Sequence, residues 1–164
     1  IQTAAHIGVR SSRRIHGVDK MTAEDVLDLR KDANSVARGA WYVDIWSAVD
    51  HEAPTIDRGR DRIARMSESL KAGDYYDIRY GCLVAKGVDN LLVAGRCLSA
   101  EHEAQASLRI QQTCMSTGEA AGVAAAMSLR AHVPPRELKP SAVAAQLRED
   151  RAHIRSAIEG VGTV

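Results

Sequence analysis

Residue types suited to binding an anionic ligand gather where a short apolar run ends. Leu91-Leu92-Val93-Ala94 is continuously apolar, and Gly95 and Arg96 follow it directly. Such a run is typical of a strand covered on both faces, and ligands of α/β sheets bind beyond the carboxyl ends of strands. Gly95 would let a ligand approach the backbone closely, and Arg96 would supply a positive charge. The pattern predicts a site for a group that carries negative charge.

The helix expected next along the chain could contribute to the same site. It is predicted to start near Thr113 and to run to about Arg130, before Pro134-Pro135. The first turn of a helix has unpaired backbone N–H groups and partial positive charge, which favour an anion. We therefore expect the N–H groups of residues 113–115 to complete the site at Gly95.

The same helix is unusually rich in small residues between Gly118 and Met127. Each glycine costs about 1 kcal/mol of helix stability relative to alanine. Gly118 and Gly122 lie four apart, and therefore on one face. That face either packs tightly against a sheet or leaves room for something to approach the backbone, and the order of strand, polar loop and helix favours the second interpretation. A membrane span is excluded, because the apolar run is far shorter than about 20 residues and contains Glu119.

A dense group of cations lies near the start of the sequence, at Arg10, Arg13 and Arg14. It could hold an acidic substrate, or it could serve a freestanding binding or assembly module that recognises phosphate or a partner. The simpler interpretation is a solvated strand edge whose arginines form ion pairs with acids elsewhere.

The first half of the chain predicts four segments that would support these residues. Residues 1–18 alternate apolar and polar side chains and are expected to be extended. Thr22 is expected to cap a helix that runs through Leu29. Residues 41–46 are aromatic and β-branched, which predicts a strand, whereas the polar residues 51–73 predict a surface excursion.

The second half predicts more regular structure. We expect strands over Tyr75–Tyr80, Cys82–Ala85 and Leu91–Ala94, with a turn over residues 86–90. A polar loop with Ser99, His102 and Arg109 should follow, and then the helix from Thr113. The last element is expected to be an amphipathic helix with Ser141 as its N-cap and with Val143, Leu147 and Ile154 on one side. This order predicts an α/β or α+β fold.

Composition narrows the class of protein further. The 164 residues suit one domain, or one domain with an appendage, and the 45% apolar content is enough for a core. Because there is no Phe and aromatics make up only 4%, that core must consist mainly of Ala, Val, Leu and Ile. Charge is nearly balanced, with 22 basic and 21 acidic residues, which argues against binding nucleic acid or a membrane surface.

The cysteines indicate a reducing compartment. Cys82, Cys97 and Cys114 are odd in number and contain no C-x-x-C, so we expect neither a disulfide framework nor a metal site. No base pairs with Cys97 or Cys114 as a catalytic thiol would require, so both are interpreted as small buried apolar residues. The sequence starts Ile1-Gln2 without a signal peptide, which predicts a cytoplasmic piece of a longer polypeptide.

Several segments together resemble a known family. They are Ile7-Gly8-Val9-Arg10-Ser11-Ser12-Arg13-Arg14-Ile15-His16-Gly17, Met21-Thr22-Ala23-Glu24-Asp25-Val26, Val43-Asp44-Ile45, Asn90-Leu91-Leu92-Val93-Ala94-Gly95-Arg96-Cys97-Leu98-Ser99-Ala100, Ser107-Leu108-Arg109, Cys114-Met115 and Gly118-Glu119-Ala120-Ala121-Gly122-Val123-Ala124-Ala125. In this order they resemble the C-terminal half of bacterial FAD-dependent oxidoreductases, and more narrowly the family that includes xanthan lyase-like proteins. The similarity covers about residues 1–130 and is strongest between Asn90 and Ala125.

The resemblance implies a flavoprotein made of two parts. The family's dinucleotide-binding fingerprint, G-x-G-x-x-G, is absent from this sequence. The chain would then be the C-terminal portion, inactive alone, which completes the FAD pocket of its missing N-terminal half. The residues implied to contact FAD are Ala94, Gly95, Arg96, Ser99, Thr113, Cys114, Met115 and Gly118. Donors at the pyrimidine edge would stabilise negative charge on reduced flavin and favour hydride acceptance from a small organic substrate.

The resemblance also suggests groups that face this substrate. In related fumarate reductase-like flavoproteins, a His and an Arg hold a substrate carboxylate, which here suggests His102 and Arg109, although the spacing is longer. A His commonly follows the family's Asp-Ile pair, whereas this chain has Trp46 after Asp44-Ile45, so its substrate is expected to differ.

The expected organisation has three parts. Residues 1–80 would belong to a substrate domain, residues 81–133 to a Rossmann-like FAD-binding domain, and residues 134–164 to a helical appendage. The surface that would meet the missing half is expected to be apolar, which also allows self-association.

Overall fold

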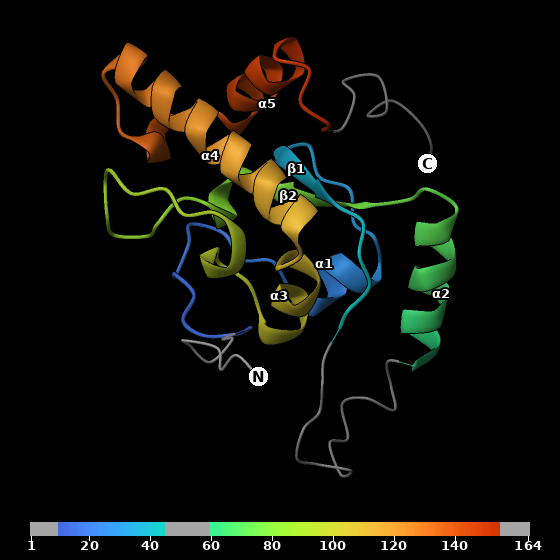
Figure 1. Ribbon diagram of the computed structural model, residues 1–164. Coiled ribbons are helices and arrows are strands. Elements are labelled where there is room, and N and C mark those ends of the chain that lie inside the picture. The colour runs from blue at the N-terminus through green and yellow to red at the C-terminus, as the bar shows by residue number, and fades with distance from the viewer. Residues whose placement is uncertain (1–9, 45–59, 155–164) are drawn as a thin grey trace, which may run out of the picture.

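The computed structural model describes residues 10–44 and 60–154, which form a mixed arrangement of helices and strands (Figure 1). Its elements are α1 (Ala23–Leu27), β1 (Ser35–Gly39), α2 (Arg60–Lys71), β2 (Tyr76–Arg79), α3 (His102–Leu108), α4 (Gln111–Ala131) and α5 (Pro140–Glu149), with the 3-10 turns η1 (Tyr80–Cys82), η2 (Gly95–Cys97) and η3 (Pro135–Glu137). The expected α/β or α+β class is confirmed.

The sheet of the described residues has two antiparallel strands, β1 and β2, and both α4 and α5 pack against β1. Gly39 pairs with Tyr76, whose ring lies directly over it. A Cβ at residue 39 would stand 2.1 Å from that ring, which is far inside contact distance. Residue 39 must therefore be a glycine, because the completely buried ring of Tyr76 lies so close to its backbone.

The expected strand over residues 41–46 is wrong for the part that the structure describes. Residues 41–44 form no strand, and residues 45 and 46 lie outside the described ranges. The strand instead occupies Ser35–Gly39, where α4 and α5 pack against it and most of its residues are buried. Trp41 and Tyr42 are partly exposed and stack on each other, with ring centroids 4.9 Å apart. Tertiary packing has overridden local strand propensity.

The expected surface excursion over residues 51–73 is wrong from residue 60 onward, where α2 forms; residues 51–59 lie outside the described ranges. The helix contains neither Gly nor Pro and has Ile63, Met66 and Leu70 at helical spacing. Met66 is 1% exposed, so this stripe anchors an otherwise polar helix at the edge of the molecule (Figure 1).

Two further strands are also wrong. Tyr76–Arg79 confirms most of the segment 75–80, but residues 82–85 contain only the end of η1 and isolated bridges. Residues 91–94 contain a single bridge, Leu92 to Val84, and Leu91 is 41% exposed. A parallel sheet would have covered that run on both faces, and the described residues contain no such sheet. The turn over residues 86–90 is confirmed.

Residues 15–21 connect two distant loops instead of forming a strand. Val18 and Asp19 donate backbone hydrogen bonds to Val84 and Gly81, and Met21 donates one to Ser99. Gly17 forms an isolated antiparallel bridge with Ala85, so the expected extended structure of residues 1–18 is present at this point. Residues 1–9 lie outside the described ranges. Residues 15–21 thereby fix the loop on which Ser99 lies.

The cap of the first helix is confirmed. The Thr22 hydroxyl accepts from the Asp25 N–H, and the Asp25 carboxylate accepts from the Thr22 N–H, which is a complete capping box. The helix is shorter than predicted, because it ends at Leu27 and Leu29 adopts a positive φ of 49°.

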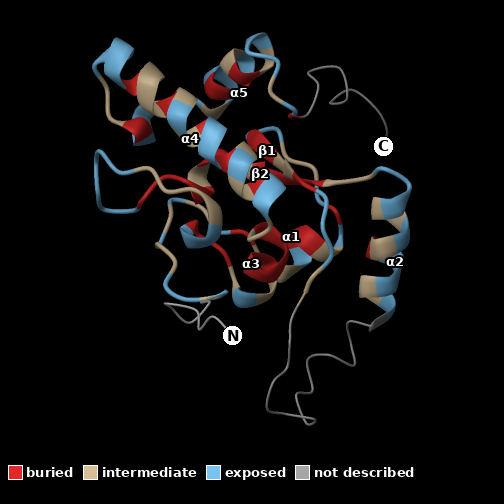
Figure 2. Cartoon of the chain, viewed as in Figure 1, coloured by how far each residue is buried: buried red, intermediate tan, exposed pale blue. Residues whose placement is uncertain are grey.

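The long helix α4 is confirmed, and its two faces differ sharply (Figure 2). Its buried residues are Thr113, Thr117, Ala120, Ala124 and Ser128. The opposite face carries Met115, Gly118, Gly122 and Leu129, all of them exposed. A Cβ at Gly118 or Gly122 would meet nothing within 4 Å, so tight packing within this chain does not explain either glycine.

The C-terminal elements follow the prediction with one shift. α4 ends at Ala131, where His132 adopts a left-handed conformation before the two prolines. The N-cap of α5 is Lys139 rather than Ser141, because Pro140 takes the first helical position, which its fixed φ suits. Val143, Leu147 and Ile154 are buried as expected, although Ile154 lies beyond the helix. Within residues 10–44 and 60–154, no helix is both long and apolar enough to cross a membrane.

Candidate functional site

Gly95 is held against the first turns of α4. Its φ is +63°, a conformation that favours glycine, and its N–H donates to the Thr117 hydroxyl at 3.1 Å. That hydroxyl donates in turn to the Thr113 carbonyl at 2.9 Å. A Cβ at residue 95 would lie 3.4 Å from the Cys114 Sγ. The structure therefore brings Gly95, which lies in a 3-10 turn and not at the end of the expected strand, together with the predicted helix start.

Arginines surround the outer side of the Gly95 turn. Arg96 lies in η2 and shares a small cavity of about 40 Å³ with Arg10, Arg13, Ser12 and Cys97. Arg10 also forms an ion pair with Asp44, 2.8 Å apart. Three guanidinium groups next to a positive-φ glycine make this surface suitable for a group with more than one negative charge.

The first turn of α4 lies behind this surface. Its N-cap, Ile110, provides no side-chain cap, so the first N–H groups of a 21-residue helix lack the usual side-chain acceptor. Thr113 is buried, Cys114 is half-buried and Met115 is 69% exposed. Burial raises the pKa of the Cys114 thiol, which keeps it protonated at neutral pH.

The remaining residues that were predicted to contact FAD differ in how far they are buried. Ala94 is half-buried beside Gly95, and Gly118 is exposed one turn along α4 from Cys114. Ser99 is 3% exposed, and its backbone is bonded to Met21 and Cys82. Cys97 is exposed, so its interpretation as a buried apolar residue is wrong; it lies in η2, a turn with no buried residue.

His102 and Arg109 are not brought together. The expected polar loop is the helix α3, which begins at His102 and has Arg109 as its C-cap, so about 10 Å of helix separates them. His102 is exposed, whereas the Arg109 side chain is 12% exposed and donates to the Asp44 carbonyl at 2.9 Å. Burial and the nearby Arg10 lower the pKa of Arg109, against the opposite effect of Asp44. Arg109 thus belongs to the Arg10–Asp44 surface.

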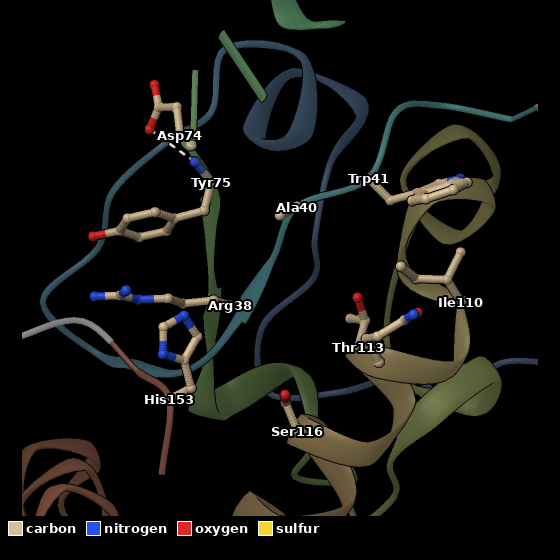
Figure 3. Close-up of a pocket in the computed structure, with 11 residues that line it drawn as sticks. Arg38, Ala40, Trp41, Asp74, Tyr75, Ile110, Thr113, Ser116 and His153 are labelled. Carbon is tan, nitrogen blue, oxygen red and sulfur yellow. Dashed lines mark hydrogen bonds between the residues drawn. The ribbon is translucent and has the colours of Figure 1, made fainter. Parts of the chain in front are cut away.

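A larger cavity of about 580 Å³, which sequence reasoning missed, opens between the start of α4, β1 and the residues after α5 (Figure 3). Its lining residues are Arg38, Ala40, Trp41, Gly73, Asp74, Tyr75, Ile110, Gln112, Thr113, Ser116 and His153. Of these, only Thr113 was predicted from the sequence. The others come from four separate segments and share no motif, so no local signal could have grouped them.

One wall of this cavity is a stack of charged and aromatic groups. The Arg38 guanidinium lies 4.0 Å from the centre of the Tyr75 ring, and the Lys31 ammonium lies 3.8 Å from the same centre. Lys31 also pairs with Asp74 at 2.7 Å. Burial opposes ionisation of Asp74, but bonds from Lys31 and the Tyr75 N–H outweigh it and lower the pKa of the carboxyl.

Among the described residues, no three His, Cys, Asp or Glu side chains are placed to hold a metal ion. The model of the family described as FAD dependent oxidoreductase matches residues 1–147. No curated protein and no solved structure gives a significant match.

Proposed function

Because this chain belongs to the family of FAD-dependent oxidoreductases, we propose that it is the C-terminal part of such an enzyme. In this proposal it completes the flavin pocket and contributes to the substrate site. The chemistry that bound FAD supplies is the acceptance of a hydride from a small organic substrate. We place the protein in the bacterial, xanthan lyase-like branch and in the cytoplasm, as the sequence resemblance and the cysteine pattern predict.

The observation that carries the proposal is the union of the Gly95 turn, three arginines and the start of α4. The Gly95 turn packs against α4 at Cys114, and Arg10, Arg13 and Arg96 line a cavity of about 40 Å³ next to it. These features fit the diphosphate of a dinucleotide, which carries two negative charges and needs close approach to the backbone. Ala94 and Arg96 would flank that diphosphate.

The start of α4 suits the flavin ring. N–H groups at Thr113, Cys114 and Met115 would donate to the pyrimidine edge and favour the reduced, anionic form. Gly118 would let the ring lie close to the helix. Ser99 stays a prediction, and its side chain is buried.

The proposed substrate groups act from different places. Arg109 lies beside Arg10 and Asp44, where its charge could hold an acidic group. His102 lies at the other end of α3, so the two residues would not grip the same carboxylate. We propose Arg109 as the substrate-facing cation, and His102 as a solvent-facing residue whose role depends on the N-terminal half.

The exposed face of α4, which carries Met115, Gly118, Gly122 and Leu129, is proposed to meet that N-terminal half. Met115 and Leu129 are 69% and 76% exposed, more than the other exposed large apolar side chains of the described residues. The two glycines between them would allow a partner to approach the helix backbone closely. A second copy of the chain is the alternative occupant.

FAD uptake by the natural polypeptide that carries this chain tests the function. We expect flavin absorption bands to survive desalting after incubation with FAD, whereas residues 1–164 alone should retain little flavin. Arg96→Gln should weaken FAD binding about tenfold, since one charge-assisted hydrogen bond is worth about 1.5 kcal/mol or more. Arg130→Gln, at the far end of α4, is the matched control and should bind normally.

The competing function is an anion-binding module that uses Arg10–Arg14. A natural polypeptide that takes up no FAD but binds inorganic phosphate through Arg10 and Arg13 would replace the oxidoreductase with that module. Flavin uptake that is equal in the wild type and in Arg96→Gln would remove the Gly95 turn from the flavin site.

A further inference from the structure

We propose that the cavity of about 580 Å³ binds an uncharged aromatic compound that carries a carboxamide group. The volume lies in the range of small-molecule pockets, about 300–1,000 Å³. Neither His102 nor Arg109 lines the cavity, so it is a different place from the predicted substrate residues. Binding needs only this chain, whereas a role in holding the substrate of the enzyme would rest on the proposed flavin function.

The charged groups at the wall of the cavity balance one another. Asp74 pairs with Lys31 at 2.7 Å. The Arg38 guanidinium lies over the Tyr75 ring, and Arg38 pairs in the sheet with Asp77, which places their side chains on the same face of adjacent strands. Two cations therefore stand beside two acids, and a charged ligand would lose its hydration without gaining an unopposed partner. The wall thus favours a ligand without charge.

Three polar side chains that line the cavity are available to such a ligand. Gln112 and Ser116 extend from α4, and His153 follows α5; Figure 3 shows Ser116 and His153 at the same end of the cavity. Within residues 10–44 and 60–154, none of these three side chains forms a hydrogen bond. An amide and a hydroxyl each donate and accept, and so does a carboxamide. A carboxylate only accepts and an ammonium only donates, so neither can use both groups fully.

The other end of the cavity is apolar, which determines what else the ligand must carry. Trp41 and Ile110 lie across the cavity from His153 in Figure 3, and Trp41 is 38% exposed. Buried hydrogen bonds fix the Trp41 backbone, because Ser107 donates to its carbonyl and Tyr76 bonds to Ser107. An indole held in place beside an aliphatic side chain suits an aromatic body.

Binding of phenylacetamide to the natural polypeptide, without added FAD, tests the proposal. We expect this amide to bind in the millimolar range that suits so small a ligand and to shift the NMR signals of the Trp41 indole and the His153 imidazole. Phenylacetate and phenethylamine have nearly the same shape but carry a negative and a positive charge, and each should bind about tenfold more weakly. No shift of these signals by the amide at its solubility limit, or equal or tighter binding by either charged compound, would overturn the proposal.

Substitutions on α4 locate the carboxamide. Ser116→Ala and Gln112→Leu should each weaken phenylacetamide binding about threefold to tenfold, because each removes one hydrogen-bonding group. Gln111→Leu changes the neighbouring exposed glutamine, which does not line the cavity, so this matched control should bind normally. None of the three positions is buried, so all three variants should fold. Wild-type affinity in both Ser116→Ala and Gln112→Leu would refute the site. Because no flavin is added, failure here is separate from failure to take up FAD.

Discussion

Gly39 is a position where an added methyl group would clash with a neighbouring ring. The ring of Tyr76 covers it and cannot swing away, because Tyr76 is fully buried and its hydroxyl is bonded to Ser107. Ser107 uses its own hydrogen toward Trp41, so Tyr76 donates in that pair. Burial raises the pKa of Tyr76, in keeping with a phenol that stays protonated as a donor.

We therefore predict that Gly39→Ala lowers the free energy of unfolding by about 3 kcal/mol, the upper range for overpacking a core. The midpoint of urea unfolding measures it. Gly118→Ala is the matched control, and it should raise the unfolding free energy by up to about 1 kcal/mol, because it improves helix propensity in open space. A Gly39→Ala protein as stable as the wild type would show that the Tyr76 ring can move.

Asp25 and Arg79 form a buried ion pair, with 2% and 12% exposed side chains, 2.9 Å apart. Burial opposes ionisation of Asp25, but bonds from Arg79, Thr22 and Arg30 outweigh it and hold the pKa of the carboxyl well below its usual range. A lowered pKa stabilises the fold above the unfolded value of about 4, and this stability disappears as the pH falls toward the folded value.

Stability should accordingly drop as the pH is lowered below about 4, and Asp25→Asn should flatten that dependence. At pH 7 the same substitution should lower the unfolding free energy by about 3 kcal/mol, because Arg79 loses a buried partner. Urea unfolding at a series of pH values gives both results. Asp89→Asn, which removes an exposed partner of Arg136, is the control and should change neither.

At the scale of elements, α4 has one face packed against its own chain and one face open (Figure 2). Under the proposed function, the open face explains why two glycines persist where alanine would stabilise the helix. Gly118→Ala and Gly122→Ala should therefore stabilise residues 1–164 but weaken FAD retention by the natural polypeptide. The midpoint of urea unfolding of residues 1–164 tests the first effect, and the amount of flavin bound by the natural polypeptide tests the second. Unchanged flavin retention in both variants would remove this face from the cofactor site.

Elements with strong local signals could be predicted from the sequence. The Thr22 capping box, the long small-residue helix and the prolines after it are all local patterns, and each is confirmed. β1 and α2 could not be predicted, because Ser35–Gly39 is strand only beneath α4 and α5, and α2 depends on the burial of Met66. The order of apolar run, polar segment and helix predicted that Gly95 and the start of α4 would lie together, although the expected strand before Gly95 did not form. Arg38, Tyr75 and His153 meet only through tertiary folding.

At the scale of the whole molecule, the exposed face of α4 predicts association. Leu129 is 76% exposed, so the isolated chain should form concentration-dependent dimers through this face. Leu129→Glu should abolish them without lowering the unfolding free energy, and sedimentation velocity at several concentrations measures the change. Val88→Glu, in a separate exposed turn, should leave the dimers intact. Monomers at every concentration in the wild type would contradict this prediction.

The hydrogen bonds of residues 15–21 also determine when this segment can fold during translation. Ala23 donates to the Glu101 carboxylate, 78 residues later. The segment before it donates backbone hydrogen bonds to Gly81, Val84 and Ser99, which are also synthesised much later. At about 5–20 residues per second, a ribosome needs about 4–16 s to make those 78 residues. The arginine-rich start of the described chain must therefore wait, unprotected, until α3 has been synthesised. Proteases and chaperones could therefore reach this segment during that interval.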